Sequence, residues 1–248
     1  MIGTDRIPAR TVVVTGASRG IGLATATLLA AEGYRVVAIA RRTSEELETA
    51  IDAAGGALRF VAADLSVSET FPDVVRRIRA EHGAIYGLVN NAALGTPGLL
   101  ATMPASDVVR LVHLNTVVPI LLTKQVVRGM MTARAGRIVN ISSVVALTGY
   151  NALSVYAATK AAMIGFTRSL ARELGPLDIT VNAIAPGFME TALTSALGAE
   201  DRDRIARRSA LRRLPLPRDV AEAVVYLMSD GARNVTGTLM TIDAGSTA

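Results

Sequence analysis

A tyrosine and a lysine at helical spacing are the residues of this sequence best suited to proton transfer. Tyr156 and Lys160 lie four residues apart in a helical stretch, so they share one helix face. A phenol ordinarily has a pKa of about 10. A neighbouring ammonium favours the phenolate and is expected to lower the pKa of Tyr156 toward neutrality. Ser143, thirteen residues upstream of the tyrosine, could hydrogen-bond a substrate carbonyl while Tyr156 delivers the proton.

A glycine-rich turn near the N-terminus suggests a ligand that carries phosphate. The sequence TGASRGIG at 15–22 directly follows a strand-like run and opens a helix. Gly16 permits a tight turn, Gly20 lets the backbone approach a pyrophosphate, and Gly22 lets helix and strand pack closely. The helix N-terminus supplies free N–H groups and the positive end of the helix dipole. The turn therefore predicts dinucleotide binding, in which Ser18, Arg19 and Ile21 also take part.

The residues after the second predicted strand indicate which dinucleotide is bound. A carboxylate at this position holds the adenosine 2′-hydroxyl in many dinucleotide-binding folds, but this strand is followed by Arg41 and Arg42. Guanidinium groups bind a 2′-phosphate well, and Arg19 could converge on it, so NADP(H) is predicted over NAD(H). Arg41 and Arg42 could instead simply flank the strand. Asp64 could accept a hydrogen bond from the adenine amino group or could cap a turn.

The elements that must position these residues alternate from one end of the chain to the other. Most strand-like runs are continuously apolar, which is typical of strands buried on both faces. The alternation with helices predicts an α/β fold, a single-domain Rossmann-type doubly wound parallel sheet of about seven strands. The predicted strands are Thr11–Thr15, Arg35–Ala40, Leu58–Ala62, Ile85–Asn90, Arg137–Ser142, Ile179–Ile184 and Leu239–Ile242. The predicted helices are Gly20–Glu32, Glu45–Ala54, Val67–His82, Pro104–Ala133, Ser154–Leu174 and Arg218–Ser229.

No linker, repeat or low-complexity segment divides the chain, so one domain is expected over 1–248. The one long stretch without a predicted strand is 187–217. Segments that follow the C-terminal ends of parallel strands face the ligand crevice, so this stretch is expected to be a substrate lid within the domain. A surface excursion that only packs on the domain is the alternative.

Composition excludes several other classes of protein. The 248 residues are 50% hydrophobic and 19% charged, which favours a full core over disorder. The sequence has no cysteine, so we expect neither a disulfide nor a thiol nucleophile. Its only histidines are His82 and His113, so we expect neither a metal site nor a Ser-His-Asp triad. The net charge is +5, but aromatic residues are only 4% and no block of like charge occurs, so no nucleic acid partner is expected. No uninterrupted apolar run of about 18 residues and no signal-peptide core are present, so no membrane span and a cytoplasmic enzyme are expected.

Taken together, the motifs resemble the short-chain dehydrogenase/reductase family along essentially the whole chain. They are TGASRGIG at 15–22, NNAA at 90–93, Asn115, the serines at 142–143, YAATK at 156–160 and PGFMET at 186–191, in the family's order. The resemblance implies that Ser143, Tyr156 and Lys160 are catalytic, and that Asn115 interrupts a helix so that a carbonyl can hold a water for proton relay. It also gives Lys160 a hydrogen bond to the nicotinamide ribose. The further cofactor-binding residues it implies are Leu65, Asn91, Ala92, Pro186, Gly187, Met189 and Thr191. Ala93 replaces the usual glycine of NNAG and could narrow the crevice.

The segments expected to border the substrate carry almost no charge. They are Leu94–Leu100, Val144–Leu153 and Phe188–Leu197, and such a pocket suits acyl chains, small ketones or cyclic alcohols. Residues 136–170 and PGFMET are similar to 3-oxoacyl-(acyl-carrier-protein) reductases, which implies an NADP(H)-dependent reduction of a 3-oxoacyl thioester. Arg134 matches a basic position that docks the acidic carrier beside the site entrance, but Gly175–Asp178 lacks the second basic residue.

Other functions stay open at this point. The first alternative is an NADP(H)-dependent reductase or dehydrogenase of another apolar ketone or secondary alcohol. A dehydratase or epimerase sharing YxxxK usually carries a larger C-terminal substrate region. A non-catalytic NADP(H)-binding sensor is a further alternative, but such a protein would typically lack the tyrosine or the lysine. The side chain of His113 is expected to be packed or solvated rather than catalytic. In the family, the helices Pro104–Ala133 and Ser154–Leu174 build a four-helix dimer interface and the C-terminal segment completes a homotetramer.

Overall fold

The computed structural model describes residues 10–189 and 199–248, with side chains from residue 203 onward in the second range. Seven strands form one sheet in the order β3-β2-β1-β4-β5-β6-β7, and every neighbouring pair is parallel. The predicted Rossmann-type doubly wound sheet is therefore confirmed. The strands are β1 Thr11–Thr15, β2 Arg35–Ala40, β3 Leu58–Ala62, β4 Ile85–Asn90, β5 Gly136–Ile141, β6 Ile179–Pro186 and β7 Leu239–Ile242.

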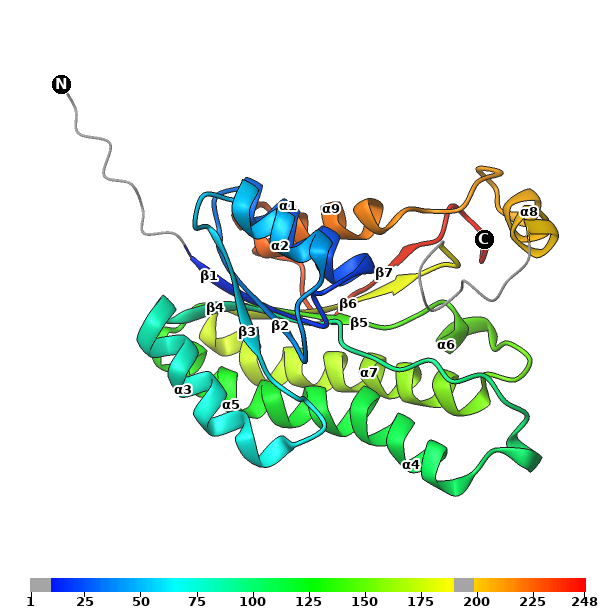
Figure 1. Ribbon diagram of the computed structural model, residues 1–248, viewed down its shortest axis with the longest axis horizontal. Helices are drawn as coiled ribbons and strands as arrows, with labels where there is room; N and C mark the ends of the chain where they lie inside the picture. The colour runs from blue at the N-terminus through cyan, green and yellow to red at the C-terminus, as the bar shows by residue number, and fades with distance from the viewer. Residues whose placement is uncertain (1–9, 190–198) are drawn as a thin grey trace.

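Helices cover both faces of this sheet (Figure 1). One face carries α1, α2 and α9, and the other carries α3, α5 and α7, with α4 continuing the line of α5. The helices are α1 Gly20–Ala31, α2 Glu45–Ala53, α3 Phe71–His82, α4 Ala105–Val112, α5 Val118–Ala133, α6 Val145–Thr148, α7 Ser154–Leu174, α8 Ala199–Arg208 and α9 Pro217–Met228.

The continuous apolar runs become strands because each must bury both of its faces. Every residue of β1, β5 and β6 is buried. Alternate residues point to opposite faces, so Val12 and Val14 join the core under α1 and α9, whereas Val13 joins the core under α3, α5 and α7. Burial on both faces stabilises the central strands and leaves their C-terminal ends as a rigid platform for loops.

Several element boundaries differ from the sequence prediction. The fifth strand begins at Gly136 and ends at Ile141, and the sixth continues to Pro186. The predicted helix Val67–His82 begins only at Phe71, with a proline in its first turn and a 3-10 turn before it. The short helix α6 and the helix α8, which lies within 187–217, were not predicted.

The long predicted helix Pro104–Ala133 is divided by a π-turn, His113–Val117, between α4 and α5. This run, from Ala105 to Ala133, is the one described helix that could cross a membrane by length and composition, and 28% of its most apolar window is buried. In the structure, α5 packs Val118, Leu122 and other apolar side chains into the core between the sheet and the helices α3, α5 and α7. The run thus belongs to the helical layer that α3, α4, α5 and α7 form on one face of the sheet.

Candidate active site

The loops that follow β1, β4, β5 and β6 meet at one edge of the sheet. The chain turns in opposite directions from β1 and β4, which are neighbours, and such a switch point opens a crevice at the C-terminal ends of the strands. Hydrogen bonds continue past the strands, from Ser142 N to Ile184 O at 2.7 Å and from Val144 N to Pro186 O at 3.0 Å. The residues predicted for cofactor and chemistry from four separate segments are therefore brought to one edge.

The glycine-rich turn has no room for side chains. Gly16 and Gly20 have φ of +66° and +58°, a backbone conformation that favours glycine. A Cβ at Gly22 would lie 2.3 Å from Gly16 O and 2.5 Å from Asn91 Nδ2. No side chain caps the N-terminus of α1, so its first-turn N–H groups remain for a ligand. This cradle fits the pyrophosphate of a dinucleotide.

Asn91 and Thr15 hold the turn in this shape. Asn91 Nδ2 donates to Thr15 O at 2.8 Å and to Gly16 O at 3.2 Å. Thr15 Oγ1 accepts hydrogen bonds from the backbone N–H groups of Asn91 and Ala92, each at 3.0 Å. The side chain of Asn91 therefore supports the glycine turn. Thr15 was not singled out from the sequence, because a threonine at the end of a strand carries no signal of its own.

Three arginines surround the far end of this crevice. The side chains of Arg19, Arg41 and Arg42 are exposed, and no ion pair of theirs occurs among the described residues. Ser44 caps α2 by accepting from Leu47 N and donates its hydroxyl to Ser18 O at 2.6 Å. This bond ties the glycine turn to the loop after β2. The arrangement is compatible with a bound 2′-phosphate.

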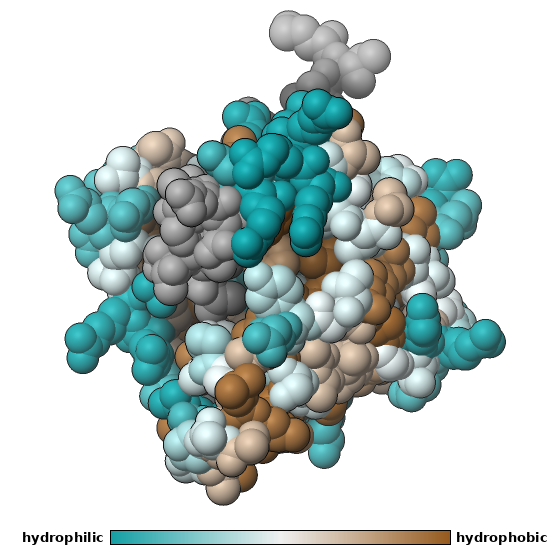
Figure 2. Space-filling model, turned by 90° about the vertical axis from the view of Figure 1, so that its right-hand side faces the viewer, coloured by the Kyte–Doolittle hydropathy of each residue, from teal (hydrophilic) through white to brown (hydrophobic). Residues whose placement is uncertain are grey.

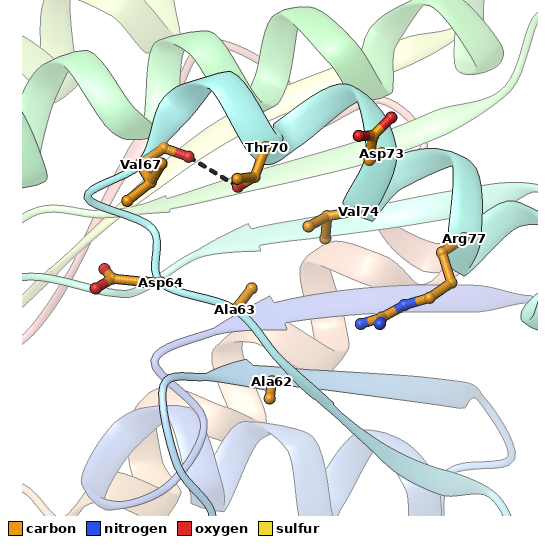
Figure 3. Close-up of a pocket in the computed structure, with 8 residues that line it drawn as sticks. All are labelled: Ala62, Ala63, Asp64, Val67, Thr70, Asp73, Val74 and Arg77. Carbon is orange, nitrogen blue, oxygen red and sulfur yellow. Dashed lines mark hydrogen bonds between the residues drawn. The ribbon is translucent and has the colours of Figure 1, made fainter.

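Asp64 lies in the loop after β3 (Figure 3), near enough to Arg41 to feel its charge. Its Oδ1 accepts from Ser66 N at 2.9 Å and from Ser66 Oγ at 2.7 Å. These two bonds, and more weakly the charge of Arg41, hold the pKa of Asp64 below its ordinary value. Asp64 is thus the turn residue that the sequence offered as one possibility, and its Oδ2 has no hydrogen bond among the described residues. A pocket of about 380 Å³ adjoins it, between β3 and α3.

The predicted catalytic residues come together at the C-terminal ends of the strands, beside the loop that follows β5. Tyr156 and Lys160 lie on α7, with exposed fractions of 9% and 3%, and Ser143 is buried just past β5. The Ser143 hydroxyl lies close enough to Tyr156 to influence the pKa of the phenol, and it accepts a hydrogen bond from Val145 N at 3.2 Å. The neighbouring Ser142 donates its hydroxyl to Lys160 O at 2.8 Å and so supports α7.

The electrostatics of this pair differ from the sequence expectation. Burial raises the pKa of Tyr156, and the neighbouring Ser143 hydroxyl offsets this only in part. Lys160 Nζ donates to Ile141 O at 2.9 Å and lies 5.7 Å from the centroid of the Tyr156 ring. The expected lowering of the phenol pKa by the ammonium is therefore wrong for this structure. Burial also lowers the pKa of Lys160 to about 8.

Asn115 occupies the π-turn between α4 and α5, so the expected interruption of the helix is present. Its Oδ1 accepts from Leu94 N at 2.8 Å, and its Nδ2 donates to Leu94 O at 2.8 Å and to Thr159 Oγ1 at 3.1 Å. Thr159 Oγ1 in turn donates to Tyr156 O at 2.7 Å. The asparagine thus joins the loop after β4 to α7, the helix that carries Tyr156. Thr159 was missed although it lies inside YAATK.

The remaining cofactor residues lie at the same edge. Leu65, Pro186 and Met189 are buried, and Gly187 N donates to Ile242 O at 2.9 Å. A Cβ at Gly187 would lie 2.7 Å from Asp243 Cβ, so the close packing requires glycine. Thr191 lies outside the described residues, as does the middle of the predicted lid, 190–198.

The entrance to the site is apolar. Figure 2 views the edge where the strands end, and hydrophobic side chains gather across the middle of that face below a hydrophilic group. The rings of Tyr150 and Phe188 lie 5.0 Å apart, and Leu99 and Leu147 are exposed by 59% and 48%. Gly98 N donates to Ala152 O at 2.8 Å, which joins two of the predicted substrate loops.

Arg134 does not lie beside this entrance within one chain. It is the C-cap of α5, at the start of β5, and its Nη2 donates to Pro176 O at 3.0 Å. Ser143 follows the other end of the same strand. The expectation that Arg134 borders the entrance is therefore wrong for a single chain, because a strand places its two ends at opposite edges of the sheet.

Comparison with known proteins agrees with this geometry. The family model of short chain dehydrogenases matches residues 10–202, and the chain belongs to this family of oxidoreductases. It is 40% identical to a 3-oxoacyl-(acyl-carrier-protein) reductase of Vibrio cholerae over 95% of this chain and 96% of the relative. It is also 40% identical to that of Escherichia coli, over 94% and 95%, and 37% identical to nodulation protein G of Rhizobium, over 95% and 96%. A crystal structure described as a candidate gluconate dehydrogenase of Agrobacterium tumefaciens is similar with a TM-score of 0.91, 25% identity and 96% coverage of both chains.

Proposed function

We propose that this protein is an NADP(H)-dependent reductase of 3-oxoacyl thioesters. The observation that carries the proposal is the buried cluster of Ser143, Tyr156 and Lys160, which lies at an apolar entrance. The relatives named as 3-oxoacyl-(acyl-carrier-protein) reductases, which match nearly the whole chain, support the substrate class.

Each residue of the site has a distinct task in this reaction. When bound, the reduced nicotinamide supplies the hydride that adds to the 3-carbonyl carbon. The Ser143 hydroxyl holds the carbonyl oxygen, and the Tyr156 hydroxyl gives its proton to that oxygen as the alcohol forms. Because burial raises the pKa of Tyr156, the phenol is protonated at neutral pH, as a proton donor must be. Lys160 holds a positive charge beside the site and hydrogen-bonds the nicotinamide ribose.

The arginines support the choice of NADP(H). Arg19, Arg41 and Arg42 would hold the 2′-phosphate, and Asp64 the adenine, with Gly16, Gly20 and Gly22 around the pyrophosphate. The pair of variants Arg41→Ser and Arg42→Ser tests this choice. The expected result is a higher KM for NADPH and an unchanged KM for NADH. Arg218→Ser is the matched control, because Arg218 is exposed on α9 and its one ion pair among the described residues is with Glu222 on the same helix.

A substrate comparison tests the reaction. Oxidation of NADPH is followed by its absorbance with acetoacetyl-CoA, with a small cyclic ketone and, in the reverse direction with NADP⁺, with a secondary alcohol. Preference for the thioester is the expected result. Preference for the ketone or alcohol would favour the alternative, a reductase or dehydrogenase of another apolar carbonyl. Tight NADPH binding without any turnover would favour a binding protein that does not catalyse.

Assembly and partners are part of the same proposal. A homotetramer in the cytoplasm is proposed on the resemblance, with 187–217 acting as a lid within one domain of 1–248. Because Arg134 lies at the edge opposite its own site, a carrier protein that contacts Arg134 would serve the site of a neighbouring copy. Loss of activity with acyl-carrier-protein substrates in Arg134→Glu, with activity on CoA thioesters retained, is the expected result.

A further inference from the structure

His113 makes a contact that the proposed reaction does not use. It begins the π-turn that carries Asn115, and its Nε2 lies 3.0 Å from Ser66 O. A carbonyl oxygen can only accept, so Nε2 carries a proton and donates. Among the described residues this is the one hydrogen bond from the α4–α5 layer to residues 63–67, the loop that follows β3.

This loop orients Asp64. Ala63 N donates to Ala40 O at 3.0 Å, which fixes the loop where it leaves the sheet, and the buried Leu65 anchors its middle in the core. Ser66 then turns back and donates both its N–H and its hydroxyl to Asp64 Oδ1. Figure 3 shows the Asp64 carboxylate projecting from the loop before the chain reaches Val67. The position of Ser66 therefore sets the direction of the carboxylate.

We propose that His113 is a positioning residue for the adenine end of the cofactor site. By holding the Ser66 carbonyl, its imidazole fixes the turn through which Ser66 aims the Asp64 carboxylate at the adenine. His113 touches neither the cofactor nor the reacting atoms. The inference rests on the proposed function only in taking the crevice beside Asp64 as the adenine site.

Binding of cofactor fragments by the full chain tests this role separately from catalysis. The probes are NADPH, ADP, which carries the adenine without the 2′-phosphate, and reduced nicotinamide mononucleotide, which lacks the adenine. The variants are His113→Phe, which cannot donate, and His113→Gln, whose amide N–H can reach the same carbonyl. His82→Gln is the matched control, because His82 ends α3 at the opposite edge of the sheet and its Nε2 faces Glu81.

The expected result is a loss of affinity confined to the adenine end. In His113→Phe, ADP and NADPH should bind roughly three- to tenfold more weakly, the effect of one hydrogen bond. Nicotinamide mononucleotide should bind as before, and His113→Gln should recover most of the loss. Ser66→Ala should also weaken the binding of ADP, because it removes one of the two hydrogen bonds that Ser66 donates to Asp64.

Three results would overturn the role of His113. They are unchanged ADP affinity in His113→Phe, an equal loss for nicotinamide mononucleotide, and no recovery in His113→Gln. A thermal unfolding curve for each variant separates loss of folding from loss of binding. If the wild type binds ADP but prefers NADH, the NADP(H) proposal fails, and ADP still reports on His113. If it binds no adenine nucleotide, both proposals fail.

Discussion

Replacing Gly22 by alanine should disrupt the phosphate cradle while leaving every charged and catalytic group in place. The new Cβ would lie 2.3 Å from Gly16 O and 2.9 Å from Gly16 C. Carbon–oxygen contacts in proteins are rarely closer than about 3.3 Å, so helix and turn would have to separate by about 1 Å. Both contacts are with backbone, so no side chain can simply rotate away.

The energetic cost follows from the same contacts. Overpacking of this kind costs about 1–3 kcal/mol. The Cβ would also lie 2.5 Å from Asn91 Nδ2, which holds the turn through two hydrogen bonds worth about 1 kcal/mol each. Alanine returns about 1 kcal/mol through its higher helix propensity. The net loss of about 2–4 kcal/mol should lower Tm by roughly 5–15 °C in a chain of this size.

Thermal unfolding and a titration with NADPH measure the two consequences. Gly22→Ala should lose stability and bind NADPH at least about tenfold more weakly, which corresponds to about 1.4 kcal/mol. Gly129→Ala is the matched control, because a Cβ at this α5 glycine meets only the flexible Arg79 side chain, at an ordinary 3.8 Å from Cζ and 4.0 Å from Nε. The control should be neutral or slightly more stable. A Gly22→Ala protein with wild-type Tm and NADPH affinity would refute the reasoning about the turn.

Three further predictions concern the catalytic helix. Tyr156→Phe should lower kcat for NADPH oxidation by at least about 100-fold while NADPH still binds, and equal turnover in this variant would rule out the phenol as proton donor. The value of kcat/KM should fall as the pH rises through about 8, because the pKa of Lys160 is about 8 and the ammonium loses its proton above that pH. A flat profile of kcat/KM from pH 7 to 9 would contradict the need for the ammonium. Thr159→Val removes the bonds to Asn115 Nδ2 and Tyr156 O and should lower kcat more than it changes KM, whereas Thr159→Ser should retain activity; equal kcat values in the two variants would contradict a positioning role.

The sequence predicted what depends on local pattern. Apolar, strand-like runs located all seven strands to within two residues at either end, and β1, β5 and β6 are buried throughout, as continuous apolar runs predict. The spacing of Tyr156 and Lys160 placed both on α7, and the strand before Ser143 placed this serine at the same edge. These predictions needed only the periodicity of helices and strands and the rule that parallel strands end together.

The rest depends on contacts between distant segments. Burial raises the pKa of Tyr156, and Lys160 donates its amine to Ile141 O; no sequence spacing could indicate either. Arg134 lies far from the entrance because the direction of β5 decides which edge it occupies. The bond from His113 to Ser66 spans 47 residues and joins two loops whose packing is set by the whole sheet.

Transfer of deuterium tests the central claim most directly. NADPH labelled with deuterium at the transferable position of the nicotinamide is incubated with acetoacetyl-CoA, and the product is analysed by mass spectrometry. The account predicts one deuterium on the carbinol carbon of 3-hydroxybutyryl-CoA with the wild type and almost no product with Tyr156→Phe. An unlabelled alcohol, or a labelled product formed equally well by Tyr156→Phe, would contradict it.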